Sequence, residues 1–142
     1  MPRIQIDLPE KYLYTTELVV RASDLNYGNH VGHDRLLTIM QDARVQFYRS
    51  LGFKNELNFE GDVGQVIADV AVQYKSETFL GDVLVIRIGV AEFSKYGFDM
   101  LYLIENELTG KQVALGKIGI VCFDYRTRKI ATIPEVLKKN LL

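Results

Sequence analysis

The chain has 142 residues, 48% hydrophobic and 25% charged, and its 17 Lys and Arg residues nearly balance its 18 Asp and Glu residues. This length suits one domain whose core needs no metal or disulfide to support it. A net charge of −1 offers no basic excess for binding nucleic acid or an anionic membrane surface. One cysteine, Cys122, excludes an internal disulfide framework. Two histidines, His30 and His33, leave little material for a metal cage, so we expect no metal.

The first residues, MPRIQID, lack the apolar core of a signal peptide, and the longest apolar stretches are far short of a membrane span. We therefore expect a soluble cytoplasmic protein. No linker, repeat or low-complexity segment interrupts the chain, so we predict a single domain over residues 1–142.

The predicted elements begin with a strand at residues 14–22, which are rich in Thr, Val and Tyr. A stretch with two Gly and two Asn follows at 23–33 and predicts a turn. The period then changes to that of an amphipathic helix from about residue 34 to residue 51. Apolar residues spaced four, three and four positions apart form its stripe: Leu36, Met40, Ala43 and Phe47. Leu37 and Leu51 extend this stripe.

The second half of the chain has the character of strands after a polar connection at 54–64. Strands are predicted at 66–74, 83–93, 96–107 and 112–125, turns at 81–82, 109–111 and 126–129, and a closing helix at 134–141. Short turns between consecutive strands predict a four-strand antiparallel meander that curls around the one long helix. One helix covers one face, so we expect the other face or an edge to pair with a second subunit, giving at least a homodimer.

The segment VRASDLNYGNHVGH at residues 20–33 resembles the motif of the 4-hydroxybenzoyl-CoA thioesterase family and the related acyl-ACP thioesterases. Those proteins typically have an Arg, then Ser-Asp-x-Asp, a small turn, and Gly-His-Val-Asn-Asn leading into the helix. The stretches DAR at 42–44, LG at 51–52, YKS at 74–76 and GD at 81–82 also match the family pattern.

This resemblance implies an α+β hotdog fold, in which a curved antiparallel sheet of about five strands wraps a long central helix. It also implies hydrolysis of an acyl-CoA or acyl-carrier-protein thioester by a dimer or tetramer. Coenzyme A enters as part of the substrate, and no separate cofactor is expected.

One position departs from the family pattern. The second Asp of the motif, in many members the catalytic carboxylate, falls on Asn26, and the two Asn after His-Val fall on Gly32 and His33. An amide cannot act as a general base or a carboxylate nucleophile. Either another carboxylate does this work, or the chain works without one, or the protein is not a hydrolase.

Thioester cleavage requires an oxyanion site and a group that activates water. The resemblance places the oxyanion donors at the backbone amides of Gly32 and His33, where a helix N-terminus favours negative charge. Asp34 at the helix start and Asp42 two turns further are the carboxylate candidates. Each also has a structural alternative, as a first-turn acid for Asp34 and as a solvated or interface acid for Asp42.

Other residues of the motif have candidate roles in the same reaction. His30 aligns with the family's histidine and can orient a carbonyl or relay a proton. Asn26 can position water or a carbonyl through its amide, although either residue can instead serve the turn alone. Tyr27 and Phe47 are expected to shape the acyl pocket, and Cys122 to be a buried, inert thiol.

Three functions stay open at this point. In an acyl-CoA thioesterase, water positioned by Asp34 or Asp42 with His30 and Asn26 attacks the thioester. A hotdog hydratase or dehydratase uses an Asp with four residues between it and a His, whereas Asp24 has five residues before His30 and Asn26 has three. A non-catalytic acyl-CoA-binding module would bind the thioester without turnover.

Overall fold

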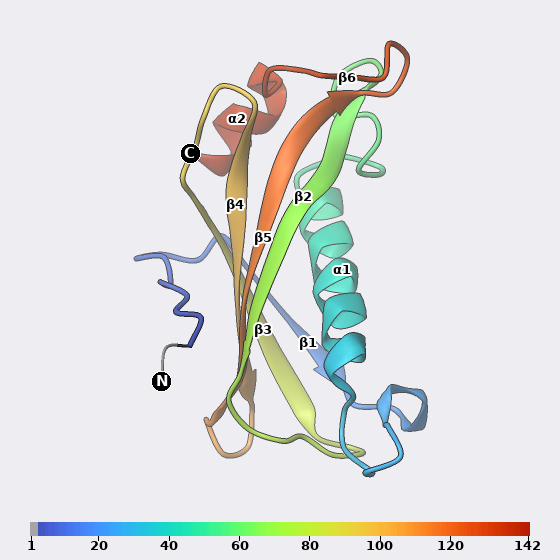
Figure 1. Ribbon diagram of the computed structural model, residues 1–142, viewed down its shortest axis with the longest axis vertical. Coiled ribbons are helices and arrows are strands. Elements are labelled where there is room, and N and C mark those ends of the chain that lie inside the picture. The colour runs from blue at the N-terminus through green and yellow to red at the C-terminus, as the bar shows by residue number, and fades with distance from the viewer. Residues whose placement is uncertain (1–2) are drawn as a thin grey trace.

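The computed structural model describes residues 3–142, in which six strands form one antiparallel sheet (Figure 1). The strands are β1 (Tyr14–Val19), β2 (Val63–Tyr74), β3 (Val83–Ala91), β4 (Gly97–Asn106), β5 (Gln112–Asp124) and β6 (Lys129–Ile130). Their order is β1-β3-β4-β5-β2, and the short β6 pairs with β5. The α-helices are α1 (His33–Ser50) and α2 (Glu135–Leu141).

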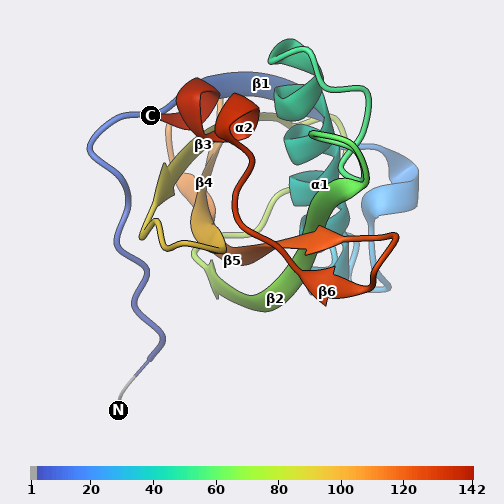
Figure 2. The same ribbon diagram turned by 90° about the horizontal axis from the view of Figure 1, so that it is seen from above.

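The sheet curves around α1, as Figure 2 shows from above. The predicted stripe is buried against the inner face of the sheet: Leu36, Met40, Ala43 and Phe47. Ile39 joins it, whereas Leu37 is 42% exposed and does not extend it. Gly116 on β5 allows the close approach, because a methyl group there would lie 2.5 Å from the Met40 side chain. The long helix and the curved antiparallel sheet confirm the predicted α+β architecture.

The strand order corrects the expected four-strand meander. β3, β4 and β5 do form a meander, but β2 pairs with β5 and lies at the far edge of the sheet. The connection at 75–82 therefore passes the ends of β5 and β4 before β3 begins, instead of closing a hairpin. This crossing carries residues 75–78 toward the N-terminal end of α1 (Figure 1).

Local turns explain where the predicted boundaries shift. β1 ends at Val19 rather than residue 22, because Ala22–Asp24 form a 3-10 turn. The basic stretch expected as a turn contributes Lys129 to β6. The closing helix α2 buries Leu137 and Leu141 at one end of the core. Among the residues described, no helix combines the length and apolar character needed to cross a membrane.

The outer face of the sheet has a smaller apolar cluster of its own, on the face or edge that the sequence analysis expected to pair with a second subunit. Leu101, Leu103 and Leu115 point away from α1 and are buried beneath the segment before β1. Ile6 of that segment is 8% exposed, and its N–H donates to Gln73 Oε1 at 2.9 Å. The N-terminal segment therefore covers part of the face that α1 leaves open.

Candidate functional site

The loop between β1 and α1 is organised by Asp24, whose side chain is fully buried. Its carboxylate accepts hydrogen bonds from the Arg21 backbone N–H at 2.9 Å, from the Arg21 guanidinium at 3.2 Å and from Arg35 Nη2 at 3.2 Å. Burial alone would raise the pKa of Asp24, but the donors of Arg21 and Arg35 outweigh it and lower that pKa. Asp24 is thus an ionised structural carboxylate.

Asn26 closes a tight turn that ends at His30. Its Oδ1 accepts the Gly28 N–H at 2.9 Å, its own N–H donates to the His30 carbonyl at 2.9 Å, and its carbonyl accepts the Asn29 N–H at 3.0 Å. Asn29 adopts a left-handed φ of 63°, which Asn tolerates better than most residues. These bonds leave the Asn26 Nδ2 without an acceptor among the residues described.

A pocket of about 330 Å³ lies between this turn, the start of α1 and the end of β2. Polar and charged side chains line most of it: Asn26, His30, His33, Tyr74, Lys75, Ser76, Glu77 and Thr78. Three apolar side chains also line it: Val31, Leu36 and Val113. The structure therefore brings three of the predicted site residues together, beside the YKS stretch at 74–76. It adds Glu77 and Thr78 of the β2–β3 connection, which the sequence did not single out.

The ring of His30 is oriented by its own loop. Its Nδ1 lies 3.2 Å from the Val31 carbonyl oxygen, which can only accept, so this contact assigns the hydrogen to Nδ1. Its Nε2 is then the accepting nitrogen of the neutral ring, and it lies 3.9 Å from Glu77 Oε1. An imidazole held in this way can take a proton from a water molecule in the pocket.

The N-terminal end of α1 borders the pocket at His33 and, among the residues described, has a backbone donor there without an acceptor. Gly32 is the N-cap, and its N–H donates to the Asp24 carbonyl at 3.2 Å. The N–H of His33, the first helical residue, has no acceptor within residues 3–142. Tyr74 Oη donates to the His33 carbonyl at 3.2 Å. Of the two predicted oxyanion donors, the His33 amide is thus the available one.

The two carboxylates predicted from the sequence lie outside this pocket. Asp34 is exposed, and its Oδ1 would lie 2.6 Å from a methyl group on Gly32, so the carboxylate covers the start of the helix. Asp42 is exposed further along α1. The pKa of Arg21 is raised mainly by Asp24, and Asp42 lies close enough to add to this rise. Neither side chain lines the pocket, and their catalytic roles stay predictions.

The two aromatic residues expected to shape the acyl pocket also lie outside it within one chain. Tyr27 is fully exposed on the turn, and Phe47 is buried in the main core between Tyr14 and Tyr48. Leu36, the first residue of the apolar stripe, provides pocket surface instead. Substrate contacts by Tyr27 and Phe47 stay predictions.

A second polar cluster lies inside the core, under the C-terminal half of α1. Arg44 Nε donates to Glu56 Oε1 at 2.8 Å, and Gln65 Nε2 donates to Glu56 Oε2 at 3.1 Å. Tyr48 Oη donates to Gln65 Oε1, and Arg44 Nη1 to Tyr102 Oη at 3.4 Å. Burial raises the pKa of Tyr102 to about 12. This satisfied network fixes the 54–62 connection to α1, and none of its members lines the pocket.

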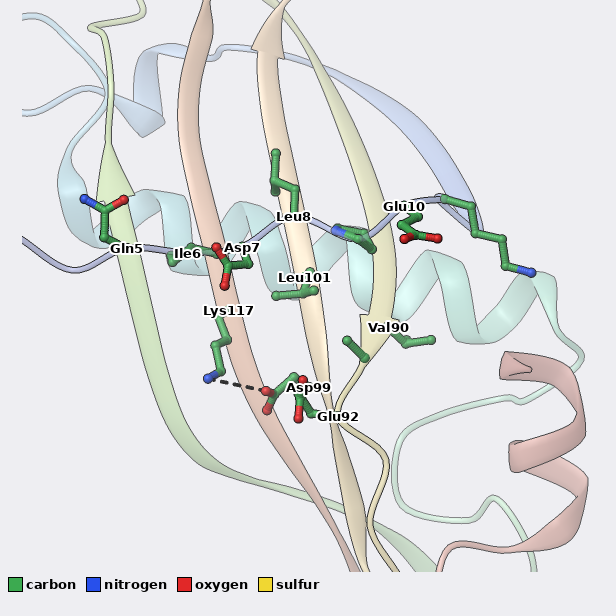
Figure 3. A pocket seen from close by; sticks show the side chains of 13 residues that line it. Gln5, Ile6, Asp7, Leu8, Glu10, Val90, Glu92, Asp99, Leu101 and Lys117 are labelled. Atoms are coloured by element: carbon green, nitrogen blue, oxygen red, sulfur yellow. Dashed lines mark ion pairs between the residues drawn. The ribbon is translucent and has the colours of Figure 1, made fainter.

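A larger hollow, of about 910 Å³, lies on the outer face of the sheet under the N-terminal segment (Figure 3). Its charged lining is mostly acidic, with Asp99 paired to Lys117 at 3.4 Å. It contains no histidine and no helix N-terminus. The smaller pocket is therefore the better candidate for thioester chemistry.

The described residues contain no group of three or more His, Cys, Asp or Glu side chains arranged to hold a metal ion. Cys122 is fully buried, and burial raises the pKa of its thiol to about 11. At neutral pH this side chain is a protonated thiol, which matches the predicted inert role.

The chain resembles known proteins in sequence and in fold. A family model described as the thioesterase-like superfamily matches residues 20–141. The chain is 30% identical over 131 residues to a putative esterase of Synechocystis, covering 89% of this chain and 78% of that protein. It is 25% identical over 130 residues to the long-chain acyl-CoA thioesterase FadM of Escherichia coli, covering 89% and 95%.

Among solved structures, a 1,4-dihydroxy-2-naphthoyl-CoA thioesterase from Synechocystis matches with a TM-score of 0.82 at 19% identity, covering 90% of this chain and 94% of that chain. This likeness confirms the hotdog fold.

Proposed function

The chain belongs to the thioesterase-like superfamily, and on that premise we propose that it is an acyl-CoA thioesterase. The observation that carries this proposal is one pocket lined by Asn26, His30 and His33 together with apolar side chains. The names of FadM and of the naphthoyl-CoA thioesterase support coenzyme A thioesters as the substrate class. An acyl-carrier-protein thioester presents the same reacting bond.

The proposed reaction uses these groups in sequence. The thioester oxygen accepts a hydrogen bond from the His33 amide at the positive end of α1. Asn26 Nδ2 and His30 Nε2 hold a water molecule whose oxygen attacks the carbonyl carbon, and its proton passes to His30. The tetrahedral intermediate then collapses, the carbon–sulfur bond breaks, and the leaving thiolate takes the proton from His30. The products are a carboxylic acid and coenzyme A.

The acyl group would occupy the apolar part of the pocket. Val31, Leu36 and Val113 supply that surface from the loop, the helix and β5. Lys75 stands at the same pocket and suits the phosphates of coenzyme A as a point charge. In this proposal the apolar residues contact the acyl chain, and the polar residues contact the thioester and its carrier.

We further propose that the working form is at least a homodimer. The outer edge of β2 has no partner strand within residues 3–142, and Ile67 and Val70 on it are 41% and 46% exposed. A long exposed edge of this kind is a template for pairing with another strand. A second copy paired with this edge would lie beside Tyr74, the last residue of β2, and Lys75, which follows it. Both of these residues line the pocket.

The proposal is tested by thiol release from a panel of acyl-CoAs that runs from acetyl to palmitoyl and includes benzoyl-CoA. We expect turnover by the wild type and a fall in kcat of about 100-fold in His30→Asn, since general base catalysis contributes about 10²–10⁴-fold. His30→Asn keeps a donor for the Val31 carbonyl but removes Nε2. Absence of turnover with every thioester would refute the proposal.

The same panel separates the roles of the candidate carboxylates. Asp34→Ala and Asp42→Ala should retain most of the kcat, because neither side chain lines the pocket. A collapse in one of them alone would identify that residue as the base. Asn26 occupies the position at which the family motif has Asp, and this favours a second candidate function, a binding module that has lost its base. That module would bind acyl-CoA without turnover and gain activity in Asn26→Asp.

A further inference from the structure

We propose that Glu77 supplies the carboxylate that position 26 lacks, acting through His30 as a positioning residue in thioester hydrolysis. This inference rests on the proposed thioesterase function. Glu77 belongs to the connection between β2 and β3, on the side of the pocket opposite the turn that carries His30. Neither the family motif nor the spacing of residues along the chain points to it.

The first support is the contact itself. Glu77 Oε1 lies 3.9 Å from His30 Nε2, and both side chains line the 330 Å³ pocket. Because Nδ1 donates to the Val31 carbonyl, Nε2 is the nitrogen that receives a proton. The nearest carboxylate to the group that gains positive charge during the reaction is therefore Glu77.

The second support is the way the two loops are tied together. The Val31 N–H, adjacent to His30, donates to the carbonyl of Thr78, adjacent to Glu77, at 3.0 Å. Thr78 is 2% exposed, and its Oγ1 donates to Asp82 Oδ2 at 2.9 Å. The Phe79 N–H donates to the same oxygen at 2.9 Å. Backbone bonding thus holds Glu77 opposite His30 even though the Glu77 side chain is 65% exposed.

The role follows from the proton transfers. When the attacking water gives its proton to Nε2, the ring becomes an imidazolium, and the carboxylate of Glu77 stabilises that charge. The proton then leaves Nε2 for the departing thiolate, so Glu77 gains and loses no proton in the cycle. Solvent screens a pair this exposed, so we expect a moderate effect, smaller than the loss of His30.

The central test compares Glu77→Gln with the wild type in thiol release from acyl-CoA. Glutamine keeps the size of the side chain and removes its charge. We expect kcat to fall by about tenfold while KM changes by less than about twofold, because the charge acts on the proton transfer and not on substrate binding. Glu77→Asp, which keeps the charge, should recover part of the lost kcat.

A matched control is Glu107→Gln. Glu107 is an exposed glutamate in the β4–β5 turn, at the same end of the sheet, and it does not line the pocket. It should keep wild-type kcat and KM. Cys122 is a buried thiol, so we expect a thiol reagent in this assay to react with coenzyme A and not with the folded protein.

A double-mutant cycle separates this role from a merely structural one. If Glu77 acts through His30, adding Glu77→Gln to His30→Asn should produce no further loss of kcat. Fully additive losses, or wild-type kcat in Glu77→Gln while the wild type is active, would overturn the inference and leave the proposed function standing. An inactive wild type would overturn both.

Discussion

The family's motif has two carboxylate positions in the loop before α1, and in this chain they hold Asp24 and Asn26. Asp24 is buried and holds Arg21 and Arg35, so its charge maintains the loop. Asn26, two residues further, lines the pocket and can only donate or accept hydrogen bonds. Replacing a carboxylate by an amide at the second position removes a base without removing the charge that holds the loop.

Asp24→Asn therefore tests stability and its pH dependence. The pKa of Asp24 is lower in the folded protein than in the unfolded chain, so its contribution is fully present above the unfolded pKa of about 3.9. It is lost as the pH falls through the folded pKa. We expect the variant to be about 2 kcal/mol less stable at pH 7.

Urea denaturation of both proteins at pH 7 and at successively lower pH measures this effect. The difference in free energy of unfolding should begin to shrink as the pH falls below about 4, where the unfolded chain binds a proton at Asp24, and should vanish below the lower pKa of the folded protein. A difference that stays constant with pH would mean that the ionised form of Asp24 is not what stabilises the loop.

At the scale of whole elements, α1 could be predicted from the sequence because the spacing of its apolar residues lies within one continuous segment of the chain. The position of β2 at the far edge could not, because alternation along a strand does not specify which strand it pairs with. The same limit applies to the site. Asn26, His30 and His33 belong to one continuous motif, whereas Glu77 reaches it only through the crossing of the β2–β3 connection.

The free edge of β2 leads to a prediction about assembly. In a two-fold pairing of β2 with β2, Val70→Asp would place unpaired carboxylates in the contact between the two strands, so the variant should be monomeric. Val19→Asp is the control, since Val19 is 54% exposed on β1 at the opposite edge.

Light scattering coupled to size-exclusion chromatography measures the mass of each form. The wild type and Val19→Asp should be dimers or larger, and Val70→Asp should have the mass of one chain. A monomeric wild type would contradict the proposed assembly, and dissociation caused by Val19→Asp alone would move the interface to β1.

For the molecule as a whole, the two faces of the sheet are covered by different parts of the chain. α1 covers the inner face, and the segment that contains Ile6 covers the outer cluster around Leu103. The N-terminal segment thus covers part of the face that α1 leaves open. The edge of β2, next to the pocket, is consequently the more exposed site for a partner.

The most direct test of the central claim is mass spectrometry of products formed from saturated and 2-enoyl-CoAs in water enriched in ¹⁸O. Hydrolysis predicts equal amounts of free coenzyme A and carboxylic acid, with one ¹⁸O incorporated into each acid molecule. An intact thioester that has gained one water would instead identify a hydratase, and an unchanged thioester bound to the protein would identify a binding module. Either result would contradict the assignment of this pocket to thioester hydrolysis.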